Sequence, residues 1–465
     1  MSSGPGRSVP AMLAVLSGPV AGLITWAACI AAGLTAPTAL VAGLTVLVAA
    51  WWIFEPLPIP ITSLLPIAVL PMAGVLTPQQ VGAAYGNALI LLLLGGFMLS
   101  QALAKSGVHR RLALGMVRAV GGQGGRRLVF GFMLASATLS MWISNTATCL
   151  MLLPIALATL EQVKDQRLTV AVLLGIAYAS SVGGMGTPIG TPPNLIFMEV
   201  YSKTTGITPS FSDYMGWALP VVLLFLPVIG LWLTRGLGPG ARLCLPQPGP
   251  WRPAERRVLT VFAVVALAWV TRTEPLGGWS AWLNLPGAND ASVALLGCVV
   301  LALIPDGENG RLLDWEHAVR IPWGILLLFG AGMTIAEGFS QSGLSVVIGD
   351  ALGRQVSALP LVVVVGAICL SVTFLTEVTS NTATAALLMP IFASVSVSAG
   401  FDPKVLMIAA AMSASCAFML PVATGPNAVV FGSERLTVAQ MAREGLAVNL
   451  IGAVLITAVV VLWVA

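Results

Sequence analysis

The sequence predicts an all-α polytopic membrane protein, and three observations support this fold class. Of the 465 residues, 57% are hydrophobic and 9% are charged, whereas a soluble domain carries about 25% charged residues. Stretches such as 169–186 and 446–465 are nearly free of charge and have roughly the 20 residues that a helix needs to cross a bilayer. The chain lacks the period-two alternation that a membrane β-barrel requires.

The N-terminal region is expected to contain membrane helices that stay in the protein. Its first residues, MSSGPGRSVPAM, hold one Arg and no small-residue cleavage site after a short apolar core, so they do not predict a removable signal peptide. We expect one or more transmembrane segments within 1–44. The abundance of Ala, Gly and Arg and the short loops favour a bacterial inner (plasma) membrane, crossed many times.

Basic residues gather in two places, and both are expected to face the cytoplasm. One group is Lys105, Arg110, Arg111, Arg118, Arg126 and Arg127, and the other is Arg235, Arg242, Arg252, Arg256 and Arg257. No aromatic side chains alternate with these charges, so they do not predict a nucleic-acid surface.

The chain contains two similar halves. SMWISNTATCLMLLP (140–154) returns 236 residues later as TEVTSNTATAALLMP (376–390), and GTPPN (190–194) returns as ATGPN (423–427). We expect a first repeat at 45–233, a cytoplasmic linker at 234–257 and a second repeat at 258–465. Two like halves are typical of secondary transporters, whose substrate site lies at the interface of the repeats.

Each half also contains a hydrophobic span that cannot form one straight helix. GGMGTPIGTPPN (183–194) and LPVATGPNAVVFG (420–432) combine glycines and prolines, and proline removes a backbone N–H and clashes with the preceding turn. Irregular backbone at membrane depth is tolerated where it lines a cavity or is buried in protein. The two spans therefore predict discontinuous helices beside a site.

The repeated Ser-Asn-Thr supplies the chemistry for an anion and a cation. Read as a helix or a hairpin arm, residues 140–148 place Ser140, Ser144 and Thr148 on one face. Ser and Asn are preferred helix N-caps, which puts Asn145 and Asn381 at the tips of re-entrant hairpins, where free N–H groups attract anions. Asn and Thr side chains can hold a carboxylate, and freed carbonyl groups suit Na⁺.

These motifs resemble those of the divalent anion/sodium symporter family, which carries dicarboxylates, citrate and sulfate. The similarity also includes WWIFEPLPIPITSLLP (51–66) and IPWGILLLFGAG (321–332), and it extends over roughly 45–465. It implies two inverted-topology repeats with re-entrant helical hairpins and discontinuous helices. It further implies about 11 transmembrane helices, a homodimer and elevator-type movement of a transport domain against a scaffold.

The resemblance also implies the residues of the site. The first sodium site is expected to use Ser140, Ser144, Asn145 and Gly190, and the second Thr376, Ser380, Asn381 and Ala423. The substrate carboxylates are expected to meet Asn145, Thr146, Asn381 and Thr382, with Gly425 close by. Gly425 stands where many members of the family have proline, which loosens the backbone beside the substrate and leaves the size of the substrate open.

Two acidic residues lie in apolar surroundings, where an ionisable group is a candidate for function. Glu377 adjoins the second motif and could bind a proton or tune the sodium site, although Met141 holds the matching position in the first copy. For Glu55 we expect a structural role with a partner.

The predicted function is secondary active import of C4-dicarboxylates such as succinate, malate or fumarate, coupled to Na⁺. A sodium-independent exchanger, or a sulfate or citrate carrier of the same fold, is an alternative. The sequence does not distinguish symport from exchange, because sodium ligands are largely backbone carbonyls. An intramembrane enzyme is disfavoured because the sequence has no His-Glu-x-x-His or paired Asp spacing. A channel is disfavoured because broken helices fit alternating access better than a continuous pore.

Overall fold

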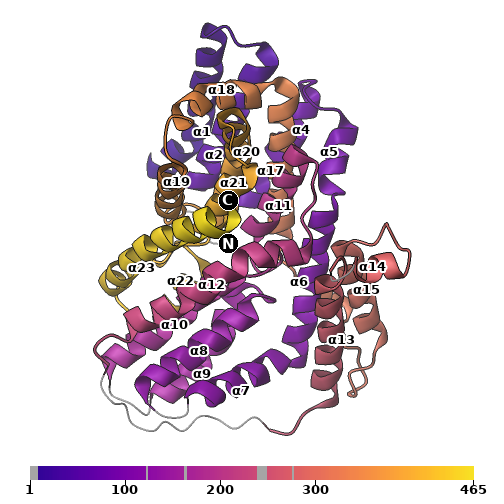
Figure 1. The fold of residues 1–465 in the computed structure, drawn as a ribbon, viewed down its shortest axis with the longest axis vertical. Helices are drawn as coiled ribbons and strands as arrows, with labels where there is room; N and C mark the ends of the chain where they lie inside the picture. The colour runs from indigo at the N-terminus through magenta and orange to yellow at the C-terminus, as the bar shows by residue number, and fades with distance from the viewer. Residues whose placement is uncertain (1–8, 122–123, 162–164, 238–248, 275–276) are drawn as a thin grey trace, which may run out of the picture.

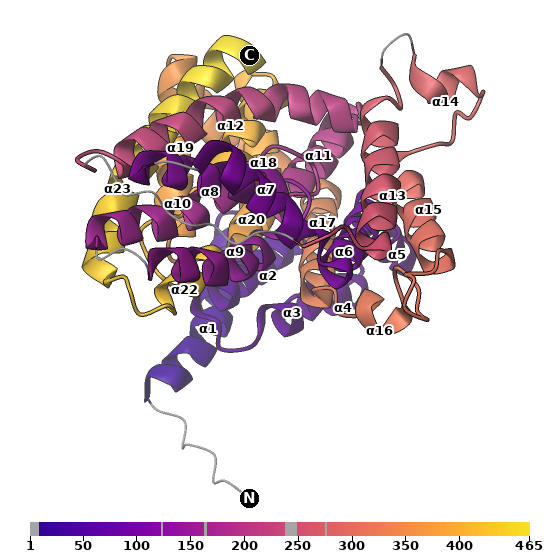
Figure 2. The ribbon, with the colours of Figure 1, turned by 90° about the horizontal axis from the view of Figure 1, so that it is seen from below.

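The computed structural model describes residues 9–121, 124–161, 165–237, 249–274 and 277–465, and their regular elements are helices (Figures 1 and 2). The first half contains α1 (Val9–Ala31), α2 (Ala36–Phe54), α3 (Ile59–Thr62), α4 (Leu64–Met72), α5 (Pro78–Tyr85), α6 (Ala88–Ser106), α7 (Val108–Gly121), α8 (Gly125–Ser140), α9 (Asn145–Leu160), α10 (Gln166–Gly184), α11 (Pro192–Thr205) and α12 (Phe211–Leu233).

The second half follows with α13 (Pro253–Val270), α14 (Gly278–Trp282), α15 (Asp290–Leu303), α16 (Trp315–Ala318), α17 (Trp323–Ser342), α18 (Leu344–Val356), α19 (Leu361–Thr376), α20 (Asn381–Ala399), α21 (Pro403–Ser413), α22 (Gly425–Phe431) and α23 (Val438–Val459). A π-helical turn, Val460–Val464, ends the last helix. In Figures 1 and 2, α13 and α15 lie side by side and carry α14 at the edge of the molecule.

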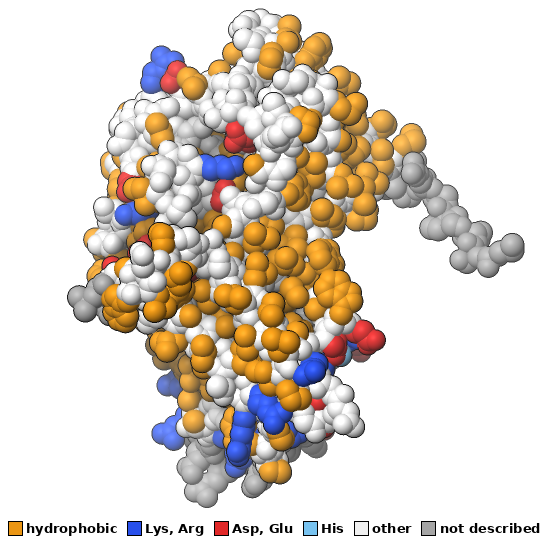
Figure 3. Space-filling view, turned by 90° about the vertical axis from the view of Figure 1, so that its right-hand side faces the viewer, with side chains coloured by type: hydrophobic (Ala, Val, Ile, Leu, Met, Phe, Trp, Pro, Cys, Tyr) orange, Lys and Arg blue, Asp and Glu red, His pale blue; other side chains and the backbone are white. Residues whose placement is uncertain are grey.

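The helices have the length and composition of membrane spans. Within the described residues, eight helical segments are long and apolar enough to cross a bilayer, and five more apolar helices are shorter. Hydrophobic side chains cover a broad part of the face in Figure 3, while Lys and Arg gather toward its lower end. In the most apolar 18-residue window of Gln166–Gly184, 83% of the residues are buried, compared with 11% in that of Met12–Ala31. The helix α10 is therefore central and α1 peripheral.

Each half contains a helical hairpin followed by an interrupted helix, as predicted. The hairpins are α8–α9 and α19–α20, and the interrupted helices are α10–α11 and α21–α22. The gaps between their segments, which we name the first loop (185–191) and the second loop (414–424), coincide with the Gly- and Pro-containing motifs. Proline explains why these spans cannot continue as straight helices.

One local prediction was wrong. Ser140 ends α8, residues 141–144 form a turn, and α9 begins at Asn145, so Ser140, Ser144 and Thr148 do not lie on one continuous helix. The expected domain limits stay a prediction; residue 45 falls within α2, and α13 begins at Pro253. Of the expected linker, 238–248 lies outside the described residues.

The two basic groups meet on one side of the protein. Arg111 Nε lies 3.1 Å from Glu255 Oε2, and an Arg111 Nη donates to the Gly249 carbonyl at 2.6 Å. Arg252 donates to the carbonyl of Ser106. The C-terminal end of α6 and the N-terminal end of α13 are thereby joined, so the two groups share one side of the protein; that this side faces the cytoplasm stays a prediction.

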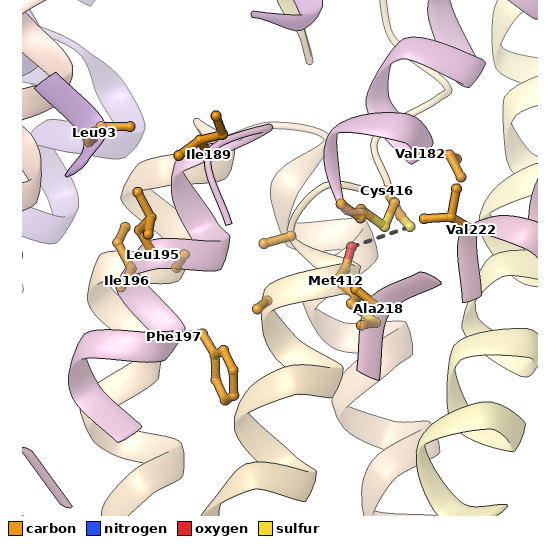
Figure 4. Packing of buried hydrophobic residues seen from close by; sticks show 14 of the residues in the cluster. Leu93, Val182, Ile189, Leu195, Ile196, Phe197, Ala218, Val222, Met412 and Cys416 are labelled. Atoms are coloured by element: carbon orange, nitrogen blue, oxygen red, sulfur yellow. Dashed lines mark hydrogen bonds between the residues drawn. The ribbon is translucent and has the colours of Figure 1, made fainter. Parts of the chain in front are cut away.

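Fully buried side chains surround the interrupted helices. Figure 4 shows Val182 of α10, Phe197 of α11 and Val222 of α12 near Met412 of α21, and these four side chains are fully buried. Cys416 Sγ donates to the Met412 carbonyl at 3.5 Å. This core fixes the loops that carry the candidate site.

Candidate functional site

The two hairpin tips face one central cavity of about 620 Å³. The first tip (residues 141–145) joins α8 to α9, and the second tip (377–381) joins α19 to α20. Nine of the predicted site residues line this cavity: Ser144, Asn145, Thr146, Gly190, Ser380, Asn381, Thr382, Ala423 and Gly425. Predictions from both halves of the sequence therefore converge at one place.

The remaining two predicted residues lie directly behind the tips. Ser140 and Thr376 are fully buried. Ser140 Oγ donates to Asn145 Oδ1 at 2.6 Å, and Thr376 Oγ1 donates to Asn381 Oδ1 at 2.8 Å. Each hydroxyl therefore fixes the amide of its tip, so that the oxygen points back to the hairpin.

Helix capping explains how each tip turns. Ser144 is the N-cap of α9, and its side chain accepts a hydrogen bond from Ala147 N at 3.3 Å. Ser380 holds the same position before α20 but makes no side-chain capping bond. The helices begin at Asn145 and Asn381, so unpaired N–H groups of the first turns lie beside the cavity.

A second pair of asparagines holds the loops in shape. Asn194 Nδ2 donates to the carbonyls of Gly184 (2.9 Å) and Thr187 (2.7 Å). Asn427 Nδ2 donates in the same way to Ala417 and Leu420, at 3.0 Å each. Sequence reasoning assigned no role to these residues, although their places in GTPPN and ATGPN were the available signal.

The two tips are tied to their loops by different groups. In the first half, Thr187 Oγ1 donates to the Met141 carbonyl at 2.5 Å. In the second half, Glu377 Oε1 accepts hydrogen bonds from Phe418 N (2.7 Å) and Met419 N (2.9 Å).

Glu377 makes two further bonds. Its Oε2 accepts from Leu420 N at 3.0 Å, and its Oε1 also accepts from Asn449 Nδ2 of α23 at 2.7 Å. With four donors around it, this buried carboxylate acts as the anchor of the second loop.

The first tip leaves a small space that is bordered by oxygen atoms. A Cβ placed on Gly184 would lie 2.5 Å from Asn145 Oδ1 and 3.2 Å from the carbonyl oxygen of Gly190. Amide and carbonyl oxygens are the ligands that interrupted helices offer to Na⁺. The residues at the first predicted sodium site therefore fit a cation, and glycine at 184 keeps the space free.

The second half provides oxygen atoms with a different arrangement. Thr376 Oγ1 also lies 3.0 Å from the carbonyl oxygen of Ala414. Among the described residues, the buried Ser415 hydroxyl, next to Ala414, has no hydrogen-bond partner, whereas the Ser413 hydroxyl interacts with the Cys369 thiol. Buried polar atoms rarely stay unpaired, so Ser415 is suited to a ligand that supplies a partner.

The two halves touch at Gly425 and Thr146. A Cβ placed on Gly425 would overlap Thr146 Oγ1, so only glycine permits this approach of α22 to α9. Gly425 also begins α22, directly after Thr424, whose side chain accepts from Asn427 N. The expected proximity of Gly425 to the site is thus present in the structure.

The charged side chains that line the cavity are both acidic. Glu55 and Glu377 belong to the described lining, which includes no Lys, Arg or His. Glu55 is exposed at the end of α2, and it makes no ion pair or side-chain hydrogen bond within the described residues. The partner that we expected for Glu55 is therefore not found, and an anion in this cavity has no fixed positive charge beside it.

Comparison with known proteins identifies the family. Residues 49–404 match the family described as "Citrate transporter" (CitMHS). The "Sodium-dependent dicarboxylate transporter SdcS" of Staphylococcus aureus, in strains USA300 and COL, is 38% identical over 445 residues, covering 90% of this chain and 85% of the relative.

A solved structure supports the fold. The YdaH transporter of Alcanivorax borkumensis, whose crystal structure is described as having an unusual topology, superposes with a TM-score of 0.61 at 15% identity, covering 83% of this chain and 86% of that one. The chain belongs to the citrate transporter family of divalent anion/sodium symporters, and it is a multi-pass membrane transporter and not an enzyme.

Proposed function

We propose that this transporter imports C4-dicarboxylates, such as succinate, malate or fumarate, together with Na⁺. The observation that carries this proposal is the convergence of Asn145 and Asn381, each at the start of a helix, on one cavity of about 620 Å³. A relative 38% identical over most of its length is named a sodium-dependent dicarboxylate transporter.

The geometry suits an anion with two carboxylates. We assign one carboxylate to Asn145 and Thr146 and the other to Asn381 and Thr382, with Gly425 between the halves. Because the Ser140 and Thr376 hydroxyls occupy the amide oxygens, the amide nitrogens are left to donate to the substrate. The N-terminal ends of α9 and α20 add the positive ends of their helix dipoles.

Sodium has two roles in this proposal. It binds at the first site, through Ser140, Ser144, Asn145 and Gly190, and at the second, through Thr376, Ser380, Asn381 and Ala423. It also neutralises a cavity that otherwise presents Glu55 and Glu377 to a dianion. Binding of the cation and of the anion is then mutually favourable.

We further propose that the protein is a homodimer in which the hairpins and interrupted helices move as a transport domain against a scaffold. The family resemblance is the support for both statements. The mass of the protein in nanodiscs, measured by mass photometry, tests the dimer.

Citrate is the second candidate substrate, and the description of the matched family favours it. Its third carboxylate requires a further donor, and the cavity lining offers the hydroxyl of Thr424, which accepts from Asn427 N and keeps its own O–H to donate. Exchange without sodium is the alternative mode for either anion.

Uptake of radiolabelled succinate into proteoliposomes tests the proposal. Accumulation that needs an inward Na⁺ gradient, in vesicles without internal succinate, is the expected result. Uptake only against internal succinate, unaffected by Na⁺, would make the protein an exchanger. Uptake of radiolabelled citrate or sulfate, with uptake of succinate absent, would reassign the substrate.

A further inference from the structure

A second cavity, of about 480 Å³, lies at the far ends of helices that also border the central cavity. The helices α11, α17 and α20 each contribute to both cavities. In α11, Pro192 lines the central cavity and Lys203 the second cavity. The corresponding pairs are Ile325 and Glu337 in α17, and Asn381 and Ser394 in α20.

The two cavities are separated along the helix axes. The paired positions are eleven to thirteen residues apart in α11, α17 and α20, which corresponds to roughly 16–20 Å at the rise of an α-helix. Since α17 is a candidate membrane span, its Ile325 and Glu337 place the two cavities toward opposite ends of that span.

Small residues close the space between the cavities. A Cβ placed on Gly332 of α17 would lie 2.8 Å from the Cβ of Ala386 in α20. Ala385 and Ala386 are each only 1% exposed. Small residues let membrane helices approach closely, and packed helices of this kind can slide past one another.

Polar contacts cross this contact surface: the Lys203–Glu337 ion pair lines the second cavity, and the Asn87–Glu199 hydrogen bond lies one turn of α11 away from it. Glu199 of α11 is buried and accepts a hydrogen bond from Asn87 Nδ2, the N-cap residue of α6, at 2.7 Å. Lys203 Nζ, one turn further along α11, lies 3.9 Å from Glu199 Oε1 and 3.7 Å from Glu337 Oε2 of α17. These contacts hold α11 to both neighbouring helices.

We propose that the second cavity is the route by which the anion site opens to the opposite side of the membrane, and that the Asn87–Glu199 and Lys203–Glu337 contacts hold this route closed. Movement of α11 and α20 along α17 breaks both contacts. Lys203, released from Glu337, then presents a positive charge to an incoming dicarboxylate. This inference depends on the proposed transport function.

Cross-linking tests whether the contact surface moves. Lys203→Cys with Glu337→Cys, joined by a bifunctional thiosulfonate, connects α11 to α17. Glu337→Cys with Gln341→Cys is the matched control, because Gln341 already bonds to Glu337 within α17 at 3.0 Å. We expect the first pair alone to lose at least tenfold in succinate uptake until it is reduced. Equal uptake by both cross-linked pairs would overturn the proposal.

A second measurement does not depend on the identity of the substrate. Ala386→Cys, at the closed contact, is labelled with a membrane-impermeant maleimide, and peptide mass spectrometry localises the label. Adding Asn87→Asp keeps the N-cap acceptor but places two carboxylates together, so labelling should accelerate about tenfold or more. Adding Glu337→Gln breaks a partly exposed ion pair and should accelerate labelling only ~2- to 5-fold.

Gln341→Ala is the control for the labelling experiment, since its bond stays within one helix. Labelling rates equal to this control in both variants would refute the closing role of the contacts, whatever the transport result. Faster labelling without succinate uptake by the unmodified protein would reject the substrate and retain the gate.

Discussion

Replacing Glu377 with Gln isolates the charge of one buried carboxylate that anchors the second loop. The change preserves shape but replaces an oxygen atom by an NH₂ group. That group would face Leu420 N, which now donates to Oε2 at 3.0 Å. One hydrogen bond is lost, and a buried N–H is left without a partner, at a cost of about 1–3 kcal/mol.

The other three hydrogen bonds to Glu377 weaken as well. Phe418 N, Met419 N and Asn449 Nδ2 all donate to Oε1, and bonds to a charged acceptor are roughly twice as strong as neutral ones. Losing that assistance adds about 0.5 kcal/mol for each of the three bonds, so the second loop is destabilised by about 2.5–4.5 kcal/mol in total.

Thermal denaturation in detergent, followed by tryptophan fluorescence, measures this effect. The control is Glu161→Gln, which removes an exposed carboxylate at the end of α9. We expect a midpoint several degrees below that of the control, and a higher Na⁺ concentration for half-maximal uptake because Ala423 and Gly425 belong to the same region. A midpoint and a sodium dependence equal to those of the control would refute the anchoring role.

Three further predictions concern the tips and loops. Asn145→Ala or Asn381→Ala should lower succinate uptake by roughly 100-fold without lowering the melting midpoint greatly; near-normal uptake by both variants would contradict the site. Gly425→Pro, which adds a Cβ against the first tip, should change the ratio of succinate to citrate uptake more than expression, and an unchanged ratio would place this glycine away from the substrate. Asn194→Ala and Asn427→Ala each lose two hydrogen bonds, about 2 kcal/mol, and should raise the sodium requirement; a requirement equal to that of the unmodified protein would show that the loops keep their shape without these amides.

Local chemistry was the part of the site that the sequence could predict. The hairpin tips follow from the capping preference of Ser before Asn, and the interrupted helices follow from proline. The repeat of both motifs indicated that they belong to one site. The continuous helical face through Ser140 and Ser144 was the alternative that the capping turn excluded.

Contacts between distant segments could not be predicted in this way. Asn449 meets Glu377 across 72 residues, and nothing in the sequence near Asn449 indicates a buried partner. The same holds for the approach of Gly425 to Thr146, which joins the two halves. For Glu55 the sequence predicted a partner that the described residues do not provide, because this acidic residue in an apolar stretch is exposed where it lines the cavity.

The described lining of the central cavity contains two carboxylates and no basic side chain, and this composition affects the release of the bound anion. A lysine in the wall would hold a dianion equally well in every conformation and would slow its departure. A cation that binds from solution can also dissociate into solution, so the affinity for the anion depends on the cation concentration outside the cavity. Whether the anion is retained or released then depends on the cation concentration on the side of the membrane that the cavity faces.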